Sequence, residues 1–198
     1  MERFQQSLRE KRNAIKRQLQ LAMSALAFAC LVLLPIGNAL QAQESTSNPS
    51  IKATLTSFSQ VPSVLAPSRG YFVATINSDT SLSFALAYGN MSSPVVQAHI
   101  HFGASRTNGG VVVFLCGGPK PACPASGTIT GTITAQDVSV LPANNPDSVI
   151  PQGIAPGNLA GLFQAIRSGN TYINVHTANF PNGELRGQVE FGGQSRVQ

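Results

Sequence analysis

Two short stretches of alternating apolar and polar residues constrain most strongly what this chain can fold into. In residues 98–103 (AHIHFG) the polar positions are His99 and His101, and in residues 172–177 (YINVHT) a similar alternation includes His176. A period of two is typical of β-strands, because successive side chains point to opposite faces. The sequence therefore predicts two strands that carry all 3 histidines of the chain, each on one face of its strand.

Residues 1–42 are interpreted as a secretory signal peptide. A basic start is followed by an apolar run from Leu19 to Ile36 and by small residues that end at Ala42. We expect cleavage after Ala42, with Ala39 as the second choice. The alternative is a retained membrane anchor, because the apolar run is close to the shortest length that spans a bilayer.

Most of the positive charge of the chain belongs to this segment. The whole chain has a net charge of +5, from 13 basic and 8 acidic residues. Residues 1–42 hold 6 basic and 2 acidic residues, so the remaining 156 residues (198 − 42) hold 7 and 6, a net charge of +1. A nearly neutral domain lacks the basic surface that binds nucleic acid. We expect a periplasmic or extracellular protein with no nucleic-acid partner and no membrane span after signal cleavage.

The part that remains after cleavage is long enough for one domain with a core. Its polar start, residues 43–50 (QESTSNPS), is interpreted as a flexible linker. The domain is expected to span residues 51–192, with a short C-terminal tail at residues 193–198.

Two cysteines, Cys116 and Cys123, frame a short loop (CGGPKPAC). Because export leads to an oxidising compartment, we expect a disulfide between them. The alternative is a pair of metal ligands, but no further cysteine or nearby histidine completes a zinc pattern.

Short alternating segments separated by Gly and Pro indicate an all-β fold. Strands are predicted at residues 51–58, 70–76, 81–88, 95–102, 111–115, 127–133, 172–177 and 184–191. Asn182-Gly183 predicts a hairpin between the last two strands. Leu159, Leu162, Phe163 and Ile166 have helical spacing, which predicts one short helix at one end of an antiparallel sandwich.

Five motifs occur in an order that resembles the CHRD domain, first recognised in chordin and found widely in bacterial exported proteins. They are AHIHFG (98–103), NGGVV (108–112), GTITG (127–131), YINVHT (172–177) and PNGELRGQ (181–188).

The resemblance covers residues 51–191, and it implies an immunoglobulin-like β-sandwich of Greek-key type. It implies no established enzyme activity. The growth-factor binding of chordin is not carried over, because a fold does not determine a function. The Cys116–Cys123 loop departs from the usual family pattern and is interpreted as a local insertion.

The three histidines are the candidate site. Two imidazoles two residues apart on one strand face, joined by a third, suit zinc or copper. Side chains on the predicted strands at 172–177 and 184–191 could then orient the rings: Tyr172, Asn174, Glu184 and Arg186. The alternatives are histidines that hold loops by hydrogen bonds to backbone carbonyls, and a surface ion pair between Glu184 and Arg186.

No nucleophile-elbow sequence or carboxylate pair is present, so no catalytic residue is assigned. The sequence favours a non-enzymatic module that binds an unidentified protein or envelope partner, with zinc or copper as the candidate cofactor. The alternative is a metal-dependent enzyme that uses zinc or copper on an unknown substrate.

Overall fold

The structure is a computed structural model that describes residues 50–192 of the chain. The predicted signal peptide, the predicted linker up to residue 49 and the predicted tail at 193–198 lie outside the described residues.

Within residues 50–192, nine strands form one continuous antiparallel sheet. They are β1 (Ile51–Thr56), β2 (Arg69–Ser78), β3 (Ser81–Gly89), β4 (Val95–Phe102), β5 (Val111–Cys116), β6 (Gly127–Ile133), β7 (Thr171–Thr177), β8 (Leu185–Gln188) and β9 (Glu190–Phe191). The same part of the chain also holds one α-helix, α2 (Leu159–Arg167), and three short 3-10 helices: η1 (Ser57–Ser59), η2 (Ala135–Asp137) and η3 (Ile150–Gln152).

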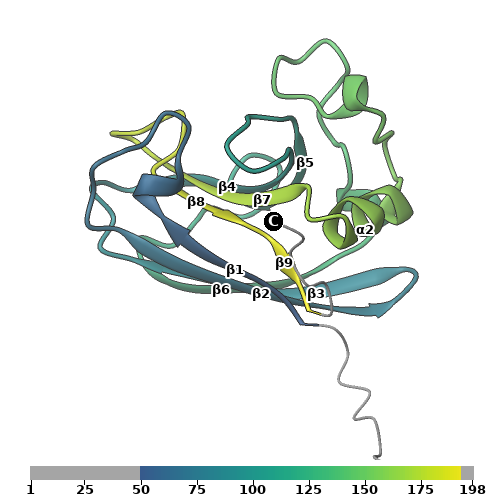
Figure 1. The fold of residues 1–198 in the computed structure, drawn as a ribbon, viewed down its shortest axis with the longest axis horizontal. Coiled ribbons are helices and arrows are strands. Elements are labelled where there is room, and N and C mark those ends of the chain that lie inside the picture. Colours follow the sequence, from purple (N-terminus) through teal and green to yellow (C-terminus); the bar gives the residue numbers. More distant parts are fainter. Residues whose placement is uncertain (1–49, 193–198) are drawn as a thin grey trace, which may run out of the picture. The chain divides into compact units, whose positions relative to one another are not determined.

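The sheet curls back on itself (Figure 1). The strand order is β5-β4-β7-β8-β1-β2-β3-β6, and β9 also pairs with β1. The strands β4, β5 and β7 therefore form a layer over β1, β2, β3 and β6. The end strands β5 and β6 contact each other, so the sheet is barrel-like.

The all-β prediction with one short helix is confirmed, but the Greek-key sandwich of immunoglobulin type is not. All strands belong to one hydrogen-bonded sheet, because β8 joins the two layers by pairing with both β7 and β1. The sequence pattern predicts individual strands, whereas this pairing depends on contacts between distant segments.

The apolar core lies between the two layers. Ala98 and Ile100 of β4 and Ile173 and Val175 of β7 face inward and are almost fully buried. Leu86 on β3 is part of the same apolar cluster from the opposite layer. Burying one Ile, Val or Leu side chain contributes about 1.5–3 kcal/mol. The apolar residues of β4 and β7 therefore face the core, and the polar residues of these strands lie on the opposite face.

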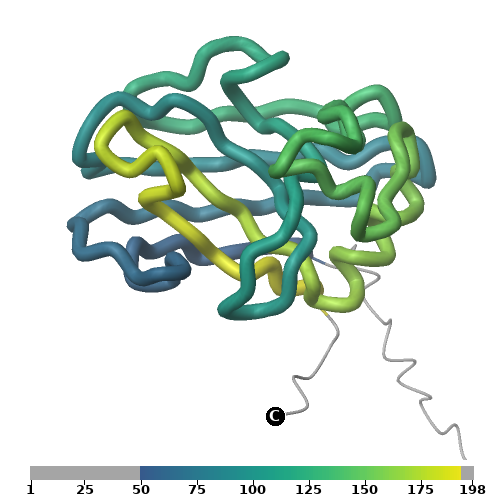
Figure 2. The backbone as a smooth tube through the Cα atoms, turned by 90° about the horizontal axis from the view of Figure 1, so that it is seen from above, coloured from purple at the N-terminus to yellow at the C-terminus, as the bar shows by residue number. Residues whose placement is uncertain are grey.

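Most element boundaries agree with the sequence prediction. The strands at 95–102 and 127–133 match β4 and β6, and α2 begins after Asn158, whose side chain accepts a hydrogen bond from Gly161. The last strand differs, because Val189 separates β8 from β9 and Glu184 precedes β8. Figure 2 shows the segment that contains α2 gathered at one end of the domain.

The predicted disulfide is present between Cys116, at the end of β5, and Cys123. Replacing both cysteines with alanine should lower the free energy of unfolding by roughly 2–3 kcal/mol, because the disulfide restricts the unfolded chain. The short length of the closed loop keeps this contribution small. Denaturant unfolding of the wild type and of the double variant would measure this difference. Alkylation of both cysteines in freshly exported protein without reductant would contradict the disulfide.

Candidate metal centre

The polar face of β4 and β7 brings the three histidines together. In the antiparallel pairing of these strands, His99 lies opposite Asn174 and His101 lies opposite Tyr172. His176 is two residues beyond Asn174, so it lies diagonally across from His99 on the same face. The register of this one strand pair therefore joins histidines that are far apart in the sequence.

The three rings are buried and close to one another. One nitrogen from each ring lies within 4.8 Å of the other two, and the exposed fractions of His99, His101 and His176 are 2%, 7% and 8%. A tetrahedral ion with bonds of about 2.0–2.1 Å needs ligand nitrogens about 3.3 Å apart. A movement of less than about 1 Å by each ring would close the three nitrogens on one ion.

Backbone carbonyls fix the orientation of two rings. Nδ1 of His101 donates a hydrogen bond to the carbonyl oxygen of Gly109 over 2.9 Å, and Nδ1 of His176 donates to that of Pro181 over 2.8 Å. A carbonyl oxygen only accepts, so the proton of each neutral ring is on Nδ1. The Nε2 atom of each ring is left with a free lone pair, as in metal-binding histidines.

Several buried ring nitrogens have no partner among the described residues. They are Nε2 of His101, Nε2 of His176 and both nitrogens of His99. Leaving a buried polar group unsatisfied costs about 1–3 kcal/mol. Loop fixation accounts for the two Nδ1 bonds, but it does not account for unsatisfied nitrogens from three rings at one point. A metal ion at that point would satisfy them together.

Glycines allow the covering loops to approach the histidines. A Cβ atom at Gly109 would lie 1.8 Å from the carbonyl oxygen of Phe102, so this position accepts no larger residue without movement of the backbone. Gly183, in the turn after β7, has a φ of +112°, which favours glycine. These two positions let the loops place the carbonyls of Gly109 and Pro181 beside the rings.

Tyr172 and Arg186 extend the site as a stack. The ring of Tyr172 lies parallel to that of His101, with centroids 4.7 Å apart and an angle of 6°. The guanidinium carbon of Arg186 lies 3.5 Å from the centroid of Tyr172. The Tyr172 hydroxyl accepts a hydrogen bond from the Gly109 amide over 3.1 Å. This stack restricts the His101 ring and ties it to the loop that carries its carbonyl partner.

Asn174 and Glu184 lie close to the site but bind other groups. Asn174 accepts a hydrogen bond from the side chain of Gln60. The buried Glu184 carboxylate accepts hydrogen bonds from Ser92 and from the Thr177 hydroxyl. Burial alone would raise the pKa of Glu184, but these hydrogen bonds outweigh it and lower the pKa.

The structure shows no hydrogen bond from Tyr172, Asn174, Glu184 or Arg186 to a histidine ring within residues 50–192. Nor do Glu184 and Arg186 form the alternative surface ion pair. Both residues are buried, and no ion pair joins them in this part of the chain.

Burial lowers the pKa of all three histidines. The pKa of His99 falls to about 2, because burial disfavours the charged ring and His101 and His176 add repulsion. Burial lowers the pKa of His101 to about 4, although its bond to Gly109 opposes the shift. Burial also lowers the pKa of His176. The rings are therefore neutral at physiological pH, which is the state that binds a metal.

Sequence reasoning offered hydrogen bonds to backbone carbonyls as an alternative role for the histidines, but it did not identify which groups orient the rings. The carbonyls of Gly109 and Pro181 belong to loops, and the ring of Phe114 packs edge-on against His99 with centroids 4.4 Å apart. The available signal was the Asn-Gly-Gly motif at 108–110 and the Pro-Asn-Gly motif at 181–183. Such glycine-rich turns often mark a close approach of the backbone to another group.

Comparison with models of known families assigns residues 51–189 to the CHRD domain. The chain belongs to the CHRD domain family. This confirms the resemblance seen in the sequence motifs. All three histidines and both orienting carbonyls lie inside the CHRD domain of this chain.

A comparison with curated proteins found no match to the chain. Within residues 50–192, which include the whole matched CHRD domain, no helix is long and apolar enough to cross a membrane. The predicted signal peptide, or anchor, precedes this part of the chain and is not described by the structure.

Proposed function

We propose that this protein is an exported, non-enzymatic CHRD-domain module that binds one zinc or copper ion through His99, His101 and His176. The observation that supports it is the group of unsatisfied ring nitrogens, which come from three buried rings and lie within reach of one ion. Its partner is proposed to be a protein or another component of the envelope or the extracellular space.

The donor set explains why zinc and copper are the candidates. Imidazole nitrogen is a favourable ligand for both ions, and neither needs a carboxylate in its coordination sphere. Three imidazoles leave one coordination position open for water or for a side chain of the partner. A bound metal would then stabilise the folded domain and would also provide a contact for the partner.

The second candidate is a metal-dependent enzyme that uses copper or zinc on an unknown substrate. The open coordination position favours it, because catalytic metal sites keep such a position. The burial of the ligands favours the binding module instead, since each ring is at most 8% exposed and a substrate would have to reach a buried ion.

Metal analysis of the protein purified from its native compartment, without an affinity tag or chelator, would test the proposal. We expect about one zinc or copper ion per chain in the wild type and almost none in His101→Ala. Gln97→Ala is the matched control, because Gln97 is on the same strand and not among the proposed ligands. Metal-free native protein would exclude both the metal-binding module and the metal-dependent enzyme.

Export is proposed from the signal-like segment, and the family match and the disulfide are consistent with it. The secreted product should begin near Gln43, because cleavage is predicted after Ala42. Intact-mass measurement of protein from the culture medium or the periplasm would check this. Recovery of a chain that still begins at Met1 from the membrane fraction would favour a retained anchor.

A further inference from the structure

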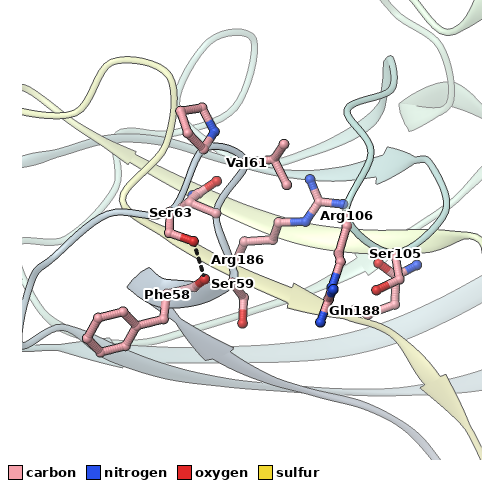
Figure 3. A pocket seen from close by; sticks show the side chains of 10 residues that line it. Phe58, Ser59, Val61, Ser63, Ser105, Arg106, Arg186 and Gln188 are labelled. Carbon is pink, nitrogen blue, oxygen red and sulfur yellow. Dashed lines mark hydrogen bonds between the residues drawn. The ribbon is translucent and has the colours of Figure 1, made fainter.

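A cavity of about 500 Å³ lies beside β8, next to the stack that borders the histidines. One wall is the segment that follows β1, from Phe58 to Ser63, and the other wall is the loop after β4, with Ser105 and Arg106. Arg186 and Gln188 of β8 line the cavity between these walls (Figure 3). Its volume is in the range that accommodates a small organic ligand.

Among the residues that the structure describes, two guanidinium groups and no carboxylate line the cavity. Arg186 is only 2% exposed, and the hydrogen bonds that it donates go to neutral oxygens of Ala104, Thr107 and Asn108. Within residues 50–192 no carboxylate lies within ion-pair distance of Arg186 or Arg106.

This arrangement leaves positive charge without a counter-charge. A guanidinium group does not lose its proton in proteins. A buried charge is costly unless an opposite charge compensates it, and the neutral oxygens and the ring of Tyr172 compensate only in part. The cavity therefore favours an anion.

The backbone at Arg106 provides an independent observation. Its φ is +63°, in the left-handed region that few residues other than glycine adopt. Strained backbone of this kind is concentrated at ligand-binding sites. Here the exposed Arg106 lies on the wall of the cavity, and Figure 3 shows it on the same side of the cavity as Ser105.

We propose that this cavity binds the carboxylate of a small organic ligand. The planar carboxylate would pair with Arg106, in the positive field of the buried Arg186, because a guanidinium group matches a carboxylate by two parallel hydrogen bonds. The Ser105 hydroxyl would donate a further hydrogen bond, and Val61, which Figure 3 shows beside the Arg186 guanidinium, would contact an apolar or aromatic body. This site is separate from the histidines and does not rest on their binding a metal.

Calorimetric titration of the metal-free protein would test the site with two acids. Benzoate represents a free organic acid, and N-acetylphenylalanine represents the carboxyl end of a peptide. Benzamide and N-acetylphenylalanine amide are neutral controls of the same shape. We expect at least one acid to bind one to one with a millimolar or lower Kd, and the amides to bind at least tenfold more weakly. Tighter binding of benzoate would identify the ligand as a free organic acid, and tighter binding of N-acetylphenylalanine would identify it as the carboxyl end of a peptide.

Arg106→Gln should weaken binding of the acid at least tenfold, and higher ionic strength should weaken it as well. Arg69→Gln is the matched control, because Arg69 is also exposed but does not line the cavity. Shifts of the amide resonances of Ser59 and Ser105 in the wild type would locate the ligand without any variant. The proposal is wrong if neither acid binds, if the amides bind equally well, or if Arg106→Gln binds as the wild type does.

Discussion

Replacing His101 with alanine is expected to reduce the affinity of the protein for zinc or copper by more than about 100-fold. Loss of a group that only orients a ligand already costs 10–100-fold in affinity, and His101 is a proposed ligand itself. Its Nδ1 atom is held by Gly109, so its Nε2 atom is available to the metal in wild-type protein. Competitive titration against a chelator of known affinity would measure the loss.

The same titration separates metal binding from loop fixation. His99→Ala and His176→Ala should weaken binding to a similar extent, because each removes one of the three proposed ligands. Gln97→Ala should bind as the wild type does. If the rings only hold loops, His101→Ala and His176→Ala should each lower the free energy of unfolding by about 1 kcal/mol, and none of the three changes should alter metal binding.

Acidification from pH 7.5 to pH 5 is expected to lower the free energy of unfolding of the metal-free protein by about 4 kcal/mol. The pKa of an unfolded histidine is about 6.5, whereas burial lowers the pKa to about 2 for His99 and about 4 for His101 in the fold. Below pH 6.5 the unfolded chain takes up protons that the folded chain does not. Each pH unit then costs about 1.4 kcal/mol per histidine, or about 2 kcal/mol each at pH 5.

The pH range of this effect distinguishes the histidines from the carboxylates. The stabilising contribution of the neutral rings is fully present above pH 6.5 and is lost as the pH falls toward the folded pKa values. The lowered pKa values of Asp137 and Glu184 also destabilise the fold in acid, but only below about pH 4.5.

Denaturant unfolding at pH 7.5, 6.0 and 5.0 would measure the pH dependence. His99→Phe should lose about half of it, because phenylalanine does not titrate and fills a similar volume. An unfolding free energy that is equal at pH 7.5 and pH 5 would mean that the rings are not buried in the neutral state.

The local structure could be predicted from the sequence wherever one periodic pattern determines it. The alternation in β3 reflects one buried face, and the spacing of Leu159, Leu162 and Phe163 reflects the buried face of α2. These patterns are local consequences of burying apolar side chains. The disulfide between nearby cysteines depends on equally local information.

The assembly of the site could not be predicted in the same way. The meeting of His176 with His99 depends on the register between β4 and β7, which long-range packing selects. The pairing of β8 with both β7 and β1 likewise makes one curled sheet where two sheets were expected. The loops that carry Gly109 and Pro181 have no periodic pattern, so their positions over the rings become visible only in three dimensions.

Anomalous X-ray diffraction from crystals of the wild-type protein grown with zinc or copper tests the central claim most directly. We expect one strong peak at about 2.0–2.1 Å from one ring nitrogen of each of His99, His101 and His176. For His101 and His176 the ligand atom should be Nε2, because Nδ1 donates to a carbonyl. Crystals that contain the metal but show no peak among the three rings would contradict the account.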